Sequence, residues 1–205
     1  VDADIVLEKD WLKKTIPWFE DPSVAVVTGY VQGGSSKLVG RIVGYYTELR
    51  HSRRPQYVDA AGSANTAYRR RAITQVGMFD EHMKIAYDTD IAQRLNNAGY
   101  LLVFNKEAKC QHYWRADLKG YLEQQYGYAY YHLEMARKSG RKHNQVTTLG
   151  MVLQAPLTVA IILGAILGGI LASPFALIAL VLLPVMHLPD TITLFATKRD
   201  WGILA

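Results

Sequence analysis

The chain has 205 residues, half of them apolar, and a formal net charge of +5. This length suits one soluble domain with an appendage. The cationic residues are not gathered on one face with aromatic residues between them, which argues against nucleic acid as a partner. The single cysteine, Cys110, excludes an intramolecular disulfide framework and a cysteine zinc site. We expect it to be a small buried residue in a strand.

The first 140 residues alternate between short apolar runs and segments whose apolar residues recur at helical spacing. This alternation predicts an α/β layered domain over residues 1–140. The apolar residues of 36–50 follow the helical period, so this helix is expected to be amphipathic. We expect strands at residues 1–6, 24–31, 57–61, 100–104 and 108–111, and helices at residues 9–19, 36–50, 70–76, 89–98 and 119–138.

The last third of the sequence has the composition of a lipid-facing segment, because residues 145–189 contain no Asp, Glu, Lys or Arg. As one helix, the apolar run 155–188 would be about 51 Å long, whereas a bilayer core is about 30 Å thick. Ser173-Pro174 supplies a natural break. We therefore expect a C-terminal transmembrane helical hairpin with helices at 149–171 and 174–195. A buried hairpin in a soluble protein is the alternative.

Basic residues flank this apolar stretch on both sides. Arg137, Lys138, Arg141 and Lys142 precede it, and Lys198-Arg199 follow it. Cations at the ends of membrane helices favour the cytoplasmic side and anionic headgroups. The domain of residues 1–140 is therefore expected on the cytoplasmic face of the cell membrane, with the lipid bilayer as a partner.

Three small groups of polar residues could carry chemistry. Asp2-Ala3-Asp4 places two carboxylates on one loop after an apolar strand, which suits Mg²⁺ or Mn²⁺, although a solvated turn is also compatible. Asp88 and Asp90 stand at the start of a helix, where one carboxylate could cap the helix or act as a general base. His112 follows a strand and could be a metal ligand or a partly exposed strand-end histidine.

The order of these groups resembles the second half of a family 2 glycosyltransferase of the GT-A fold. The pattern is G-x-x-N-x-x-x-R-R from Gly62, then V-G-x-F-D-E from Val76, then D-x-D-hydrophobic-x-x-R-L-x-x-x-G-Y from Asp88. The D-A-D sequence at the start falls where that family has its metal motif. The resemblance covers residues 1 to about 135, and it implies a partial GT-A domain ahead of the membrane segment.

The resemblance also implies roles for individual residues. Asp2 and Asp4 would hold a divalent metal on the diphosphate of a nucleoside diphosphate sugar, and His112 would complete the metal site. Asp88 corresponds to the catalytic base, with Asp90 as the less favoured choice. The residues expected to bind donor or acceptor are Gly62, Ser63, Ala64, Asn65, Asp90, Arg94, Gln124 and Gln125.

Two departures from the family pattern bear on the function. Tyr87 stands where relatives have a glutamate that positions the acceptor. Gln124-Gln125 is not followed by the Arg-Trp pair of processive members, which indicates a non-processive enzyme. The expected reaction is an inverting, metal-dependent sugar transfer to a hydroxyl of a polyprenyl-linked or cell-envelope glycan. An inactive glycosyltransferase-like membrane scaffold and another metal-dependent nucleotide-using transferase are the alternatives.

The first residue is Val1, not methionine. In the family pattern, the strands that recognise the nucleotide come before the D-A-D motif. We therefore expect them upstream of Val1, and we expect the chain to be inactive by itself.

Overall fold

The computed structural model describes residues 2–115, 117–139, 157, 159–164 and 166, with side chains described as far as residue 131 of the last long helix. The chain forms two compact units, residues 1–145 and 146–205. The described residues of the second unit are helical. Within the described ranges, no helix is both long and apolar enough to cross a bilayer. The predicted transmembrane helix 174–195 lies outside those ranges, and so does all of 149–171 except residues 157, 159–164 and 166.

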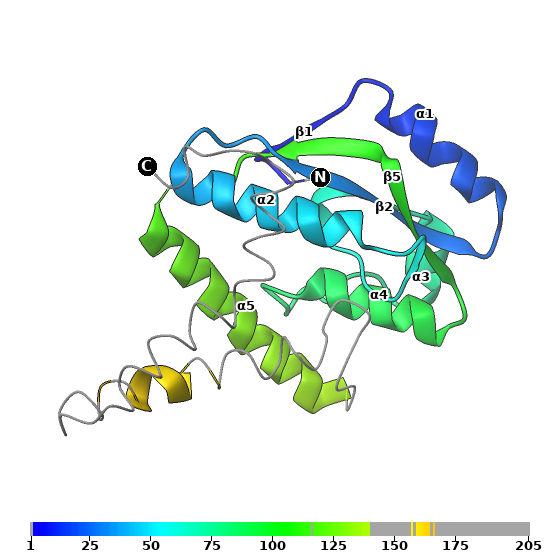
Figure 1. The fold of residues 1–205 in the computed structure, drawn as a ribbon. Coiled ribbons are helices and arrows are strands. Elements are labelled where there is room, and N and C mark those ends of the chain that lie inside the picture. Colours follow the sequence, from blue (N-terminus) through cyan, green and yellow to red (C-terminus); the bar gives the residue numbers. More distant parts are fainter. Residues whose placement is uncertain (1, 116, 140–156, 158, 165, 167–205) are drawn as a thin grey trace. The chain divides into compact units, whose positions relative to one another are not determined.

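The first unit is built on a five-stranded mixed sheet in which β1, β5, β2 and β4 are neighbours in that order (Figure 1). β2 and β5 are parallel, whereas β1 and β3 pair antiparallel with opposite ends of β5, and β4 pairs antiparallel with β2. The strands are β1 (Ile5–Leu7), β2 (Val24–Gly33), β3 (Tyr57–Val58), β4 (Thr66–Tyr68) and β5 (Leu101–His112).

Both faces of β2 are covered, because side chains alternate between the two faces of a strand. Val26 packs into the larger core, which includes residues of α3 (Arg70–Gln75) and α4 (Tyr87–Asn97). Val27 packs into a smaller cluster with Trp18 of the 3₁₀ helix η1 (Ile16–Glu20), which follows α1 (Trp11–Thr15). This α/β arrangement is consistent with a partial GT-A domain.

The β2–β5 ladder contains an irregularity that places the loop ahead of β4. Gly29 pairs with Asn105, but the next residue, Tyr30, pairs with Lys109, so β5 bulges between them. Asn65 closes this gap, since its Nδ2 donates to the carbonyls of Tyr30 and Ala108 at 3.1 and 3.0 Å. The loop of residues 62–65 is thereby fixed against the centre of the sheet.

Helix α2 (Leu38–Ser52) covers the edge of β2 beyond the end of β4. The Gly33 N–H donates to Glu48 Oε1 at 2.9 Å, and the Val31 N–H donates to His51 Nδ1 at 3.1 Å. Side chains of α2 thus take the place of a neighbouring strand. This satisfies backbone donors that would otherwise lack partners.

Four sequence expectations about elements need correction. The strand expected at residues 1–6 begins only at Ile5, because Ala3 and Asp4 of the D-A-D sequence form a turn ahead of β1. The helix expected at 9–19 divides at Ile16, where the chain tightens into η1 around Pro17. Residues 100–104 and 108–111 belong to one strand, because β5 continues through its bulge. The loop 62–65 contains a short 3₁₀ turn, η2 (Ser63–Asn65), and leads into β4, which was not expected.

Candidate active site

The turn that carries Asp2 and Asp4 lies beside the last residues of β5. In the antiparallel β1–β5 ladder, Ile5 pairs with His112, and the Tyr113 N–H donates to the Asp4 carbonyl at 3.0 Å. Asp4 Oδ2 lies 3.1 Å from His112 Nε2. The strand pairing therefore brings together two of the three predicted metal ligands.

The His112 side chain is buried and well supported, with its ring centroid 3.6 Å from that of Trp114. Its Nδ1 is buried and has no hydrogen-bond partner within the described part of the chain. Carboxylate oxygen and imidazole nitrogen are suitable ligands for a divalent metal. However, the described residues contain no group of three His, Cys, Asp or Glu side chains arranged to hold a metal ion. A metal at Asp4 and His112 would therefore need further ligands from water or from a bound molecule.

Ser63 connects Asp2 with the start of α4. Its N–H donates to Asp88 Oδ2 at 3.0 Å, and its hydroxyl donates to Asp2 Oδ1 at 3.5 Å and lies 3.2 Å from the Tyr87 hydroxyl. Ala86, which precedes these α4 residues, has a φ of +64°, an uncommon conformation for a residue with a Cβ. The left-handed turn at Ala86 and the bonds to Ser63 together direct Tyr87 and Asp88 toward Asp2.

A cleft of about 590 Å³ opens between this cluster and one face of α5 (Leu118–Ser139). On one side its lining includes Asp2, Ser63 and Asp88, and on the other side it includes Gly120, Gln124 and Tyr128. The predicted base and one predicted metal ligand thus share a concave site with one of the two predicted glutamines. A ligand-sized cleft with convergent polar groups is the usual form of a binding site.

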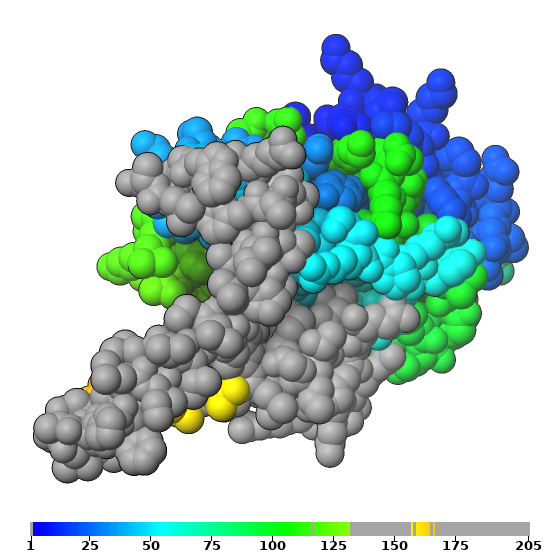
Figure 2. Space-filling model, in the orientation of Figure 1, coloured from blue at the N-terminus to red at the C-terminus, as the bar shows by residue number. Residues whose placement is uncertain are grey.

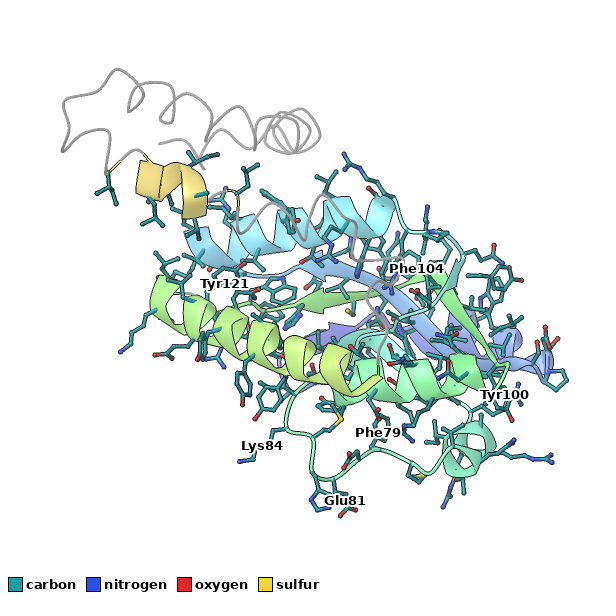
Figure 3. The ribbon with its side chains drawn as sticks, turned by 90° about the horizontal axis from the view of Figure 1, so that it is seen from below. Phe79, Glu81, Lys84, Tyr100, Phe104 and Tyr121 are labelled. Carbon is teal, nitrogen blue, oxygen red and sulfur yellow. The ribbon has the colours of Figure 1, made fainter. Side chains whose placement is uncertain are left out.

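The cleft contains charges of both signs. Burial is the main cause that raises the pKa of Tyr128, and the carboxylates of Asp88 and Asp2 raise it further. Two cationic side chains also line the cleft. One is Arg115, three residues after the strand β5 ends, and the other is Lys84, on the loop ahead of α4 that Figure 3 shows. The cleft therefore offers both carboxylates and cations to a ligand.

Asp90 and Arg94 do not line the cleft, although both were predicted to bind donor or acceptor. Arg94 donates to Asp90 Oδ2 from Nη2 at 2.6 Å and from Nε at 2.9 Å, and it also donates to the Val76 carbonyl. The pair therefore ties α4 to the segment after α3. Asp88, unlike Asp90, has its carboxylate at the cleft, and we retain it as the candidate base.

Four more predicted binding residues do not line the cleft, namely Gly62, Ala64, Asn65 and Gln125. Asn65 is 1% exposed and uses its amide to join Trp11, β2 and β5. Ala64 lies in the same 3₁₀ turn, and Gln125 is exposed on α5. Gly62 does border Asp88, since a Cβ added to it would lie 3.8 Å from Asp88 Oδ2.

The sequence motifs did not point to Lys84 and Arg115. Both lie close to motif residues, Lys84 four positions before Asp88 and Arg115 three positions after His112. A charged residue next to a catalytic motif is the signal that could have identified them. That signal is weak, because surface loops commonly carry charged residues.

Comparison with known proteins bears on the identity of this site. A family model described as glycosyl transferase family group 2 matches residues 1–193. The pre-mycofactocin glycosyltransferases of Mycobacterium tuberculosis strains CDC 1551 / Oshkosh and ATCC 25618 / H37Rv are each 30% identical to the chain over 132 residues. The match covers 60% of this chain but only 28% of each relative, so the chain spans less than a third of their length. Since the family model covers most of the sequence, the chain belongs to glycosyl transferase family group 2.

Proposed function

We propose that this chain is the acceptor-side part of an inverting glycosyltransferase that uses a nucleoside diphosphate sugar. Asp88 takes the proton of the acceptor hydroxyl while the acceptor oxygen forms a bond to the anomeric carbon. The bond between that carbon and the diphosphate breaks, and the nucleoside diphosphate leaves with the electron pair. This single displacement inverts the anomeric configuration.

The position of Asp88 is the observation that carries this proposal. Its Oδ2 accepts the Ser63 N–H at the wall of the cleft, and Asp2 lines the same cleft. A general base must lie within hydrogen-bond reach of the proton that it removes, so an accessible carboxylate is required. Asp90 does not line the cleft, and Arg94 binds its carboxylate.

We propose Asp4 and His112 as holders of a divalent metal, Mg²⁺ or Mn²⁺, with Asp2 close by at Ser63. Such an ion would neutralise charge that develops on the departing diphosphate. The chain supplies the Asp4 carboxylate and the His112 imidazole, which are 108 residues apart in the sequence. The backbone bond from Tyr113 to the Asp4 carbonyl holds the turn of Asp4 near the ring of His112.

For the acceptor, we propose a hydroxyl of a lipid-linked or cell-envelope glycan. The apolar stretch 145–189 and its basic flanks support a membrane location with the catalytic domain on the cytoplasmic side. The absence of an Arg-Trp pair after Gln124-Gln125 supports a non-processive reaction. In place of the family glutamate, the Tyr87 hydroxyl lies 3.2 Å from Ser63 Oγ and offers a neutral hydrogen-bonding group to the acceptor.

The test compares Asp88→Asn with Asp90→Asn in the full-length enzyme, using release of nucleoside diphosphate from a panel of donors. We expect Asp88→Asn to lower transfer by roughly 10²- to 10⁴-fold, the range for a lost general base, with donor affinity nearly unchanged. Asp90→Asn should lower stability and retain transfer. Normal turnover in Asp88→Asn would remove this residue from the mechanism. A wild-type protein that turns over no donor would favour the scaffold alternative.

The hairpin is tested separately by labelling with a membrane-impermeant thiol reagent. Ala205→Cys in a Cys110→Ser background places a thiol after the apolar stretch. The proposed hairpin returns the chain to the cytoplasm, so this thiol should react only after the cells are opened. Labelling from outside intact cells would show that residue 205 has crossed the bilayer.

A further inference from the structure

Helix α2 exposes its apolar side and buries its small and polar side. The residues that are buried against the sheet are Gly40, Gly44 and Glu48. Leu38, Ile42 and Tyr46 are 50%, 41% and 38% exposed and recur every four residues, so they form one stripe along the helix. A surface helix normally turns its apolar side toward the core. The orientation of α2 is therefore the reverse of the usual one.

Close backbone packing fixes this orientation. A Cβ added to Gly44 would lie 2.8 Å from the Gly33 Cα, so only a glycine side of the helix fits against β2. The bond from the Gly33 N–H to Glu48 Oε1 holds the same side inward. Rotating the helix to bury its apolar stripe would break both contacts. The exposed stripe therefore follows from the fold, and part of the α2 segment is visible on the surface in Figure 2.

Helix α5 carries a second exposed apolar stripe. Leu118, Leu122 and Tyr126 are 59%, 56% and 76% exposed and also recur every four residues. Gly120 and Gln124 line the cleft. They lie two positions after Leu118 and Leu122. Positions two apart lie on different sides of a helix, so α5 faces the cleft with one side and solvent with the other.

The segment that leads into α5 contacts α2. Trp114 lies just before α5, and a Cβ on Gly44 of α2 would be 3.6 Å from its Cδ1. The Ser35 hydroxyl, just before α2, donates to the Trp114 carbonyl at 3.0 Å. Trp114 therefore connects α2 with the segment that leads into α5. We call Leu38, Ile42 and Tyr46 on α2 and Leu118, Leu122 and Tyr126 on α5 the apolar stripes.

A cationic residue borders the stripe of α2, since the Arg50 guanidinium lies 5.9 Å from the centre of the Tyr46 ring. The stripe of α5 has neighbours of both signs, because Lys119 follows Leu118, whereas Asp117 precedes Leu118 and Glu123 follows Leu122. Glu48, the acidic residue of α2, faces the sheet. After α5, the sequence continues through the basic residues of 137–142 into the uncharged residues 145–189. Leucine and tyrosine beside cations match the boundary between anionic headgroups and acyl chains.

We propose that the apolar stripes of α2 and α5 dock on the surface of a lipid bilayer that contains anionic lipids. This contact is separate from the anchoring by residues 149–195, because it involves the first compact unit. Docking by the outer side of α5 would bring the cleft on its inner side close to the lipid surface. An acceptor held in that surface would then lie near Asp88, a consequence that rests on the proposed function, whereas the docking itself does not.

The experiment uses the full-length protein in vesicles of phosphatidylcholine and phosphatidylglycerol. Ile42→Cys and Leu122→Cys report on the two stripes after labelling with a small thiol-reactive fluorophore. Leu12→Cys is the matched control, because Leu12 is 62% exposed on α1, away from α2 and α5 (Figure 1). Cys110 can stay, since burial raises the pKa of its thiol to about 12 and keeps it unreactive. Fluorescence is quenched either by nitroxide-labelled lipid or by aqueous iodide.

We expect nitroxide lipid to quench the labels at residues 42 and 122 several-fold more than the label at residue 12, with the opposite order for iodide. Equal quenching at all three positions would overturn the proposal, as would a protein that does not bind the vesicles. Protection from iodide without quenching by nitroxide lipid would identify a protein as the occupant and would also overturn it. Sugar transfer measured in the same vesicles reports separately on the proposed function.

Discussion

Asn65 is a buried residue whose replacement tests how the candidate site is held on the sheet. Its Oδ1 accepts from Trp11 Nε1 at 2.5 Å, and its Nδ2 donates to the carbonyls of Tyr30 and Ala108. Asn65→Ala leaves these three partners without their hydrogen bonds. At about 1 kcal/mol for each buried group left unsatisfied, we expect a loss of about 3 kcal/mol. This is a large share of the roughly 5–15 kcal/mol that stabilises a typical domain.

Amide hydrogen exchange measured by mass spectrometry on peptides from β2 and β5 can detect this loss in the full-length protein. Exchange from core strands requires a large opening of the fold, so its rate reports the free energy of that opening. A loss of about 3 kcal/mol corresponds to exchange that is roughly 150-fold faster, because about 1.4 kcal/mol is one factor of ten. Peptides that cover the bulge at Tyr30 and Ala108 should show the largest change.

Asn97→Ala is the matched control, because Asn97 is exposed at the end of α4. An exposed substitution of this kind usually changes stability by no more than about 0.5 kcal/mol. Exchange in Asn65→Ala that stayed within about threefold of the control would refute the reasoning. The bulge would then be stabilised by the backbone alone, and the position of Ser63 would not depend on Asn65.

Three further predictions concern packing, pH and metal binding. Gly29→Ala should lower stability by about 1–3 kcal/mol or more, seen as a lower Tm, because the added Cβ would lie 2.0 Å from the Ala108 carbonyl oxygen. Burial, and then the nearby arginines, lower the pKa of His51 to about 3. The contribution of His51 to the free energy of unfolding is therefore complete above pH 6.5 and decreases as pH falls toward 3. Between pH 7.5 and 5.5 we expect about 1 kcal/mol of this loss in urea unfolding, discounted for the partial exposure of His51. Asp4→Asn and His112→Ala should each weaken Mn²⁺ binding by roughly tenfold or more in calorimetric titration.

Each of these three has an outcome that contradicts it. A Tm unchanged by Gly29→Ala would mean that β5 moves away without cost. His51→Asn keeps an acceptor for the Val31 N–H but does not titrate, so an unchanged pH dependence in this variant would exclude His51 as the cause. Asp21→Asn, in an exposed turn where the carboxylate binds Ser23, is the control for metal binding. Equal Mn²⁺ affinity in this control and in His112→Ala would remove His112 from the metal site.

Local patterns were sufficient to predict most of the elements. The apolar run of 24–31 became the central strand β2, and the periodic segments became α2, α3, α4 and α5. The direction in which α2 faces could not be predicted from its apolar period. That direction depends on contact between Gly33 and Gly44, which are distant in sequence, and a hydrophobic pattern does not record a backbone contact.

The sequence predicted those residues of the candidate site that belong to short motifs. Asp88, Ser63 and Gly62 lie together because the loop and the start of α4 are joined by direct hydrogen bonds. The structural role of Asn65 was not predicted, because a motif does not show whether a polar residue binds a ligand or the sheet. Its burial and its bonds to strands 35 and 43 residues away become apparent only in the fold.

The two sides of α5 relate the chemistry of the cleft to the surface of the domain. Gln124 and Tyr128 face the cleft, while Leu122 and Tyr126 are exposed and have no part in its lining. A helix that served only to close the cleft would need apolar or specific residues on its inner side alone. Leucine and tyrosine exposed on its outer side are unfavourable in water. Helix α2 likewise exposes leucine, isoleucine and tyrosine, so the lipid contact proposed above would cover apolar residues of both helices.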